Sequence, residues 1–304
     1  MRVQLGINNC FALKRWPTPD DWAGVVRDDL DLGLVELSLD LVEGLEVPAE
    51  RVHSVERTRA ALQEHGLTAE TTFTGLAAYG LNLLMHPDPE RREAALRWYR
   101  TVVDVSAQLG AQATGGHVGT MSVPDWTAPA RRSERWSDLR HALMEISGRA
   151  HDAGLEYLLI ENLVSVREPS TMDVVDGLLT EGDGAHVPVR LCLDLGHQCV
   201  PGTEGDERDP YAWLRRFGSR VAEVQLQQSD ALGDHHWPFT EERNAQGRIE
   251  PGRVLDTLAA AGAGDVLLVL EVIPGWEEED AQVVEGLRAS VHVWKAALRE
   301  RGLL

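Results

Sequence analysis

Four stretches in the second part of the chain decide the fold: EYLLIE at residues 156–161, VRLCLD at 189–194, VAEVQLQ at 221–227 and VLLVLE at 266–271. Each is a short, mostly apolar run, as expected for a buried strand, and each ends in a carboxylate or an amide. Similar runs precede them at residues 3–7, 34–39, 67–73 and 111–117. The sequence therefore predicts eight strands that are spread over the whole chain.

Longer segments with apolar residues at helical spacing separate these runs. They include residues 93–110, 137–154 and 283–302. Gly110 and Gly154 stand directly before the next strand, where glycine commonly ends a helix. Strands that alternate with helices pair in parallel, because each crossover connection needs a helix. Eight such units predict an α/β fold, a single (β/α)₈ barrel domain over residues 1–304.

The competing fold is an open, doubly wound sheet. Such a sheet usually carries a glycine-rich phosphate turn after its first strand. Here the first strand is followed by NNCFALKRW at residues 8–16, which contains no glycine. This difference favours the barrel.

Composition excludes several classes of protein. The chain has 29 Lys and Arg against 49 Asp and Glu, a formal net charge of −20, which opposes binding to nucleic acid phosphates. No run reaches eighteen apolar residues, so we expect no membrane partner. Three cysteines without a CxxC motif, and a polar N-terminus, favour reduced thiols and a cytoplasmic location.

The ends of the later strands carry the candidate chemistry. In a barrel the carboxyl ends of the strands form the site, and three carboxylates there would repel one another. A divalent cation removes that conflict, and oxygen ligands favour Mn²⁺ or Mg²⁺. The expected metal ligands are Glu161, Asp194, Gln227 and Glu271. Taken singly, each carboxylate could instead cap a helix or lie on the rim, and Gln225 lies one layer deeper than Gln227.

Histidines end or follow three of the predicted strands, the fourth, sixth and seventh. His117 follows a glycine pair, His197 belongs to DLGH, and His236 lies in GDHHWPF beside His235 and Trp237. We expect His117 to take part in proton transfer, and His197, His236 and Trp237 to bind the substrate. The alternatives are a buried structural histidine for His117 and solvated loops for the others.

Cations near the predicted rim are candidates for an anionic substrate group. Phe11, Lys14 and Arg15 follow the first strand, and Arg167 follows the fifth. Guanidinium and ammonium groups beside an aromatic ring suit a phosphate or a carboxylate. A solvated rim with buried aromatic residues is the alternative.

The full pattern resembles the xylose-isomerase-like TIM barrels. The similarity rests on Glu161 on strand five, Asp194-x-x-His197 after strand six, a polar residue on strand seven and Glu271 on strand eight. The segments LGINNCFALKRWP and LQQSDALGDHHWPF are similar to a branch with tetrulose-phosphate epimerases and 3-oxo-sugar-acid decarboxylases. One departure is Gln227, where this superfamily commonly has histidine.

The resemblance implies a metal-dependent isomerase or 3-epimerase of a ketose or ketose phosphate. Glu161 and Glu271 would be the acid and base that form and quench an enediolate. A 3-oxo-sugar-acid decarboxylase or a 3-oxo-C-glycoside lyase would use the same site, and a non-catalytic sugar-binding barrel is the alternative from another class. The resemblance also implies a small sugar as the partner and pairing of barrels into a homo-oligomer. An endonuclease IV-like enzyme is not expected, because the additional histidines are lacking and the net charge of −20 opposes DNA.

Overall fold

A computed structural model describes all of residues 1–304 and shows a closed, parallel barrel of eight strands. The strands follow one another around the barrel in chain order. Their bounds are β1 Val3–Asn8, β2 Val35–Ser38, β3 Thr71–Phe73, β4 Ala113–Gly116, β5 Tyr157–Glu161, β6 Val189–Asp194, β7 Val221–Leu226 and β8 Val266–Leu270. The predicted (β/α)₈ barrel is confirmed, since each of the eight runs overlaps one of these strands.

Helices connect the strands, as the parallel pairing requires. Their bounds are α1 Pro19–Gly24, α2 Pro48–His65, α3 Pro89–Leu109, α4 Val123–Thr127, α5 Pro129–Ala153, α6 Met172–Gly182, α7 Pro210–Phe217, α8 Glu241–Gln246, α9 Pro251–Ala260 and α10 Asp280–Glu300. As predicted, α3 and α5 end at Gly110 and Gly154, whose φ angles are 87° and 86°. None of the helices combines the length and hydrophobicity that a membrane-spanning segment requires.

The residues group into two compact units, each made of separate chain segments. The first unit comprises Met1–Glu36, Ala60–Thr68 and Cys192–Leu304, and the second comprises Leu37–Arg59 and Ala69–Leu191. We describe each unit by itself.

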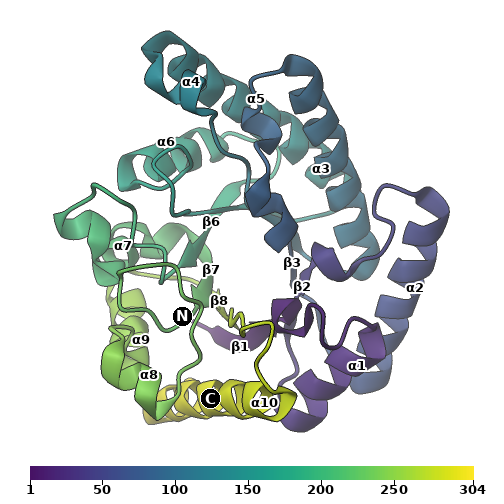
Figure 1. Cartoon of the computed structure of the whole chain (residues 1–304), viewed down its shortest axis with the longest axis vertical. Helices are drawn as coiled ribbons and strands as arrows, with labels where there is room; N and C mark the ends of the chain where they lie inside the picture. The colour runs from purple at the N-terminus through teal and green to yellow at the C-terminus, as the bar shows by residue number, and fades with distance from the viewer. The chain divides into compact units, whose positions relative to one another are not determined.

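In the first unit, β8 pairs with β1 on one side and with β7 on the other (Figure 1). Val269 is the partner of Gly6 in β1 and of Gln225 in β7. Outside these strands, the ring of Phe239 packs edge-on against Trp294 of α10, with the centroids 5.5 Å apart. This packing fixes the segment after β7 on α10.

In the second unit, β4 lies between β3 and β5, and Thr114 is paired with Thr72 and Leu158. A glycine is needed at position 115, because a Cβ atom there would lie 1.9 Å from the carbonyl oxygen of Leu159. The next residue, Gly116, has a φ of 112°, which a residue with a side chain rarely adopts. The glycine pair therefore shapes the end of β4 directly before His117.

Candidate active site

The first unit brings together three predicted residues from the ends of β6, β7 and β8. Asp194, Gln227 and Glu271 are each fully buried. The Oδ1 atom of Asp194 accepts hydrogen bonds from the backbone N–H groups of Gly196 at 2.6 Å and His197 at 3.0 Å. The DLGH turn thus folds around its own carboxylate and fixes where it points.

Gln227 is oriented by two neighbours. Its Oε1 atom accepts the backbone N–H of His236 at 2.6 Å, so its Nε2 group faces Asp194 at 3.1 and 3.2 Å. The amide oxygen that the sequence suggested as a metal ligand is therefore engaged by the backbone. In this geometry Gln227 holds Asp194 and His236 in place.

His236 reaches into the same group from the loop after β7. Its backbone φ is 47°, a strained value for a residue other than glycine. Its Nδ1 atom lies 3.1 Å from the carbonyl oxygen of Glu271 and 3.6 Å from Glu271 Oε2. An imidazole that donates Nδ1–H to a carbonyl presents Nε2 as its ligand atom, the usual arrangement of a metal-binding histidine.

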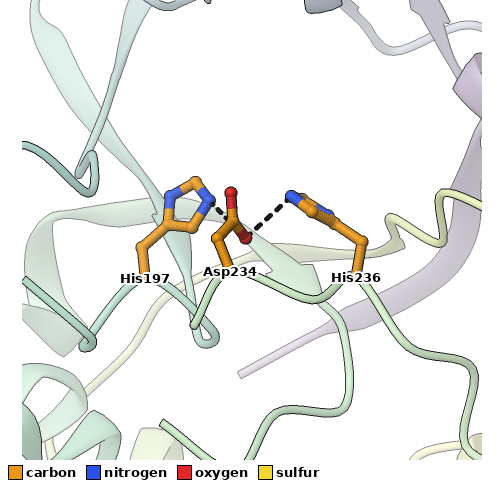
Figure 2. A group of neighbouring side chains, drawn as sticks. All are labelled: His197, Asp234 and His236. Carbon is orange, nitrogen blue, oxygen red and sulfur yellow. Dashed lines mark ion pairs between the residues drawn. The ribbon is translucent and has the colours of Figure 1, made fainter. Parts of the chain in front are cut away.

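Asp234 is a site residue that the sequence analysis missed. Its Oδ1 atom lies 3.3 Å from His197 Nε2, 3.0 Å from His236 Nε2 and 3.1 Å from Gln227 Nε2. Figure 2 shows this carboxylate between the two imidazoles. The signal was in GDHHWPF, where an acid precedes the histidine pair, but only the histidines were considered.

The charges of this group act strongly on one another. Burial and the neighbouring Asp194 raise the pKa of Glu271 to about 8, although His236 opposes the change. Burial lowers the pKa of His236, but the hydrogen bond and charge of Asp234 outweigh it and raise that pKa to about 9. Burial raises the pKa of Asp234, but His197 and His236 lower it by more. The group therefore joins the buried side chains of Glu271 and His236 to the exposed carboxylate of Asp234 at its edge.

Two sets of side chains in the first unit could each hold a metal ion. One is Asp194, His236 and Glu271, and the other is His197, Asp234 and His236; the ligand atoms of each set lie within 4.8 Å of one another. Carboxylates with an imidazole suit a divalent transition metal, so the donor chemistry fits the expected cation. The predicted ligand Gln227 lies beside these sets, with its Nε2 atom 3.1 Å from Asp194 and 3.1 Å from Asp234.

The second unit holds the other two predicted catalytic residues. Glu161 ends β5, and both of its oxygens lie 2.6 Å from the hydroxyl of Tyr79. The ring of Tyr79 stacks on His117 with the centroids 4.8 Å apart. Tyr79 thus connects Glu161 with His117. No sequence motif pointed to Tyr79, which lies in a loop helix at Leu76–Gly80.

Residues 31–293 match the xylose isomerase-like TIM barrel family. The chain belongs to this family.

Relatives in this family share nearly the full length of the chain. The chain is 30% identical to D-erythrulose 1-phosphate 3-epimerase of Brucella abortus (strain 2308), over 97% of this chain and 96% of that protein. A putative xylose isomerase of Rhodospirillum rubrum has 33% identity and a TM-score of 0.89, covering 97% of this chain and 99% of that one. D-Psicose 3-epimerase of Clostridium cellulolyticum, at 16% identity and a TM-score of 0.72, covers 97% of this chain and 99% of that chain and shares the fold.

The two cationic side chains that were predicted near the rim after β1, Lys14 and Arg15, both contact other residues of the protein. Arg15 donates to Asp280 at 2.5 Å and to the carbonyl of Gly275 at 2.6 Å. Lys14 lies over the ring of Trp276, 4.4 Å from its centroid. Arg15 therefore fastens the loop after β1 to the beginning of α10.

Three further residues that were predicted to bind the substrate also contact other protein groups. Phe11 is buried, and its ring packs edge-on against Trp16. Arg167 donates to the carbonyl of Met121 at 2.6 Å. The ring of Trp237 stacks on His235 at 4.0 Å and lies 4.3 Å from the Arg243 guanidinium carbon. Phe11 thus packs within the segment after β1, Arg167 connects the segments after β5 and β4, and Trp237 contacts α8.

Proposed function

We propose that this protein is a divalent-cation-dependent ketose-phosphate 3-epimerase, with D-erythrulose 1-phosphate as the first substrate to test. The observation that carries the proposal is the buried set of Asp194, His236 and Glu271, whose ligand atoms converge within 4.8 Å. The substrate class is supported by the relative from Brucella abortus, whose sequence this chain matches over nearly its full length.

The cation would be held by Asp194, Glu271 and His236, with Glu161 as the further ligand that the sequence predicts. Mn²⁺ suits this mixture of carboxylates and one imidazole better than Mg²⁺. When bound, such a cation polarises the substrate carbonyl and stabilises negative charge on its oxygen. Gln227 serves the site by orienting Asp194.

Proton transfer is the task of the two glutamates. Burial and the neighbouring Asp194 raise the pKa of Glu271, which makes its carboxylate a stronger base. In the proposed reaction Glu271 and Glu161 face opposite sides of the substrate. One removes the proton from the carbon beside the carbonyl, and the other returns a proton to the same carbon from the opposite side. One proton leaves and one arrives, so the configuration inverts without oxidation or reduction.

The other polar groups of the site would hold the substrate. His197 and Asp234 lie beside His236 and can exchange their mutual contact for substrate hydroxyl groups. Tyr79 keeps the carboxylate of Glu161 fixed through both oxygens. Rigid placement of acid and base is what proton transfer at carbon requires.

Solvent exchange tests this proposal. The Mn²⁺-loaded protein in D₂O is expected to incorporate deuterium at C3 of D-erythrulose 1-phosphate and to form its C3 epimer, which NMR resolves. With unphosphorylated D-erythrulose, whose C1 hydroxyl is free, deuterium at C1 of the ketose and an aldose product would instead indicate an isomerase. Release of CO₂ from 3-oxo sugar acids would indicate the decarboxylase, and no reaction with any ketose or 3-oxo acid would contradict an enzymatic role.

Two substitutions separate catalysis from folding. Glu271→Gln removes the base and is expected to lower kcat about 10³-fold or more. Glu242→Gln on the exposed face of α8 is the matched control and is expected to leave kcat unchanged. A Glu271→Gln variant with full activity would refute the assigned base.

A further inference from the structure

The strands of the first unit carry a second group of buried polar side chains that the proposed reaction does not use. These are Asn8 at the end of β1, Glu36 in β2, and Glu223 and Gln225 in β7, each at most 1% exposed. Polar groups so deeply buried lower stability unless they satisfy one another. Their contacts therefore indicate what they do.

Asn8 is held in one orientation. Its Oδ1 atom accepts the backbone N–H of Cys10 at 2.8 Å, which turns its Nδ2 group to the other side. That group lies 2.7 Å from Oε2 of Glu36 and 3.5 Å from Oε1 of Glu271. One amide thus faces a deep carboxyl group and the proposed catalytic base at the same time.

Glu36 and Glu223 form a buried acid pair. The two carboxyl groups lie close enough to interact, and negative charges that are buried together oppose each other's ionisation. Burial and the charge of Glu223 both raise the pKa of Glu36 well above its usual value. Gln225 Nε2 lies 3.5 Å from Glu36, and Cys192 Sγ lies 3.3 Å from Glu223. Each carboxyl group of the pair therefore has a neighbouring hydrogen-bond donor.

The two oxygens of Glu271 have different neighbours. Oε1 faces the amide of Asn8 at 3.5 Å, and Oε2 faces Nδ1 of His236 at 3.6 Å. These two neighbours together define how the carboxylate is rotated. Without Asn8, the orientation of Glu271 toward a substrate would be fixed from one side only.

We propose that Asn8 is a positioning residue for Glu271, and that the Glu36–Glu223 pair keeps the Asn8 amide turned toward it. The inference rests on the proposed function for the two roles of Glu271, as the base and as a metal ligand. Oε2 of Glu36 accepts from the Asn8 amide at 2.7 Å, and the burial of both residues leaves this amide little freedom to turn away.

The first test replaces Asn8 by a side chain of similar size that cannot hydrogen-bond. Asn8→Leu is expected to lower kcat by about 10- to 100-fold, the effect of losing a hydrogen bond to a charged group, with KM almost unchanged. It is also expected to weaken Mn²⁺ binding by about tenfold, as loss of a group that orients a metal ligand does. Electron paramagnetic resonance measures free Mn²⁺ without any substrate.

The second test uses rescue by a conservative variant. Glu36→Gln keeps one acceptor for Asn8 and one donor for Glu223, so kcat and Mn²⁺ affinity are expected to stay within about threefold of wild type. Glu36→Leu removes both and is expected to behave like Asn8→Leu. Thr114→Val is the control for a lost buried hydrogen bond, because Thr114 accepts from Thr72 in the second unit at 2.6 Å. It is expected to lower the melting temperature and to leave kcat and Mn²⁺ affinity unchanged.

The outcomes separate this inference from the proposed function. Wild-type kcat and Mn²⁺ affinity in Asn8→Leu would overturn the positioning role, and a Glu36→Gln variant as impaired as Glu36→Leu would overturn the role of the acid pair. If Asn8→Leu does not fold, Asn8→Ser carries the same expectations and the same refutation. If wild type turns over no ketose phosphate, the proposed function fails, while Mn²⁺ affinity still decides the role of Asn8.

Discussion

Gly196 is a residue whose missing side chain supports the site. A Cβ atom at this position would lie 2.2 Å from Cδ of Gln227, which in turn contacts Asp194. Gly196→Ala is therefore expected to displace Gln227, to weaken Mn²⁺ binding about tenfold and to lower stability by about 1–3 kcal/mol. Metal titration and urea unfolding measure these two effects.

The control for this prediction is another glycine with open space around it. No atom lies within 4 Å of a Cβ placed on Gly177 in α6. Gly177→Ala is expected to raise stability by about 0.5–1 kcal/mol and to leave Mn²⁺ binding unchanged. A Gly196→Ala variant that binds Mn²⁺ as wild type does would show that Gln227 does not orient Asp194.

Single residues also show where prediction from the sequence ends. Asp194 and Glu271 could be predicted as site candidates, because carboxylates recur at the ends of several predicted strands. The orientation of Gln227 could not, since it depends on the backbone N–H of His236, nine residues away in a loop. Tyr79 and Asn8 were missed for the same reason, because their partners are distant in sequence and no spacing rule connects them.

At the scale of elements, α10 holds the segment that leads from β7 to α8. The backbone N–H of Phe239 donates to Ser290 Oγ at 2.8 Å, and that hydroxyl donates to the carbonyl of Gly286. Ser290→Ala leaves a buried N–H group without its acceptor, so we expect stability to fall by about 1–3 kcal/mol. Thermal unfolding checks this value.

Exposed Ser219 provides the comparison for Ser290. Ser219→Ala is expected to change stability by less than about 0.5 kcal/mol, as surface substitutions usually do. Equal melting temperatures for the two variants would mean that the hydroxyl of Ser290 does not anchor the loop.

The sequence predicted the existence and order of the strands more accurately than their first and last residues. The run at residues 67–73 contains β3, but the strand covers only Thr71–Phe73. Thr68 forms an isolated bridge with Leu34 instead, so the apolar pattern extends beyond the strand. An apolar run indicates which side chains are buried. Here the buried side chains begin before the residues that form continuous hydrogen bonds with the neighbouring strands.

At the scale of the whole molecule, the net charge of −20 acts against the folded state. Like charges repel one another in a compact chain, and salt screens that repulsion. We therefore expect the melting temperature at pH 7 to rise as NaCl increases from low concentration to about 0.5 M, as the Debye length shortens. This response needs no specific site, and calorimetry or circular dichroism measures it.

A divalent cation that binds the proposed site should raise the melting temperature further, beyond this general effect of salt. A ligand that binds only the folded state stabilises it by about 4 kcal/mol at 1,000 times its Kd. At matched ionic strength, MnCl₂ is therefore expected to raise the melting temperature more than NaCl does, and Asp194→Asn is expected to remove only that additional increment. An equal response of wild type and Asp194→Asn to MnCl₂ would mean that Mn²⁺ acts through surface charge alone, because the buried carboxylate of Asp194 would then make no contribution.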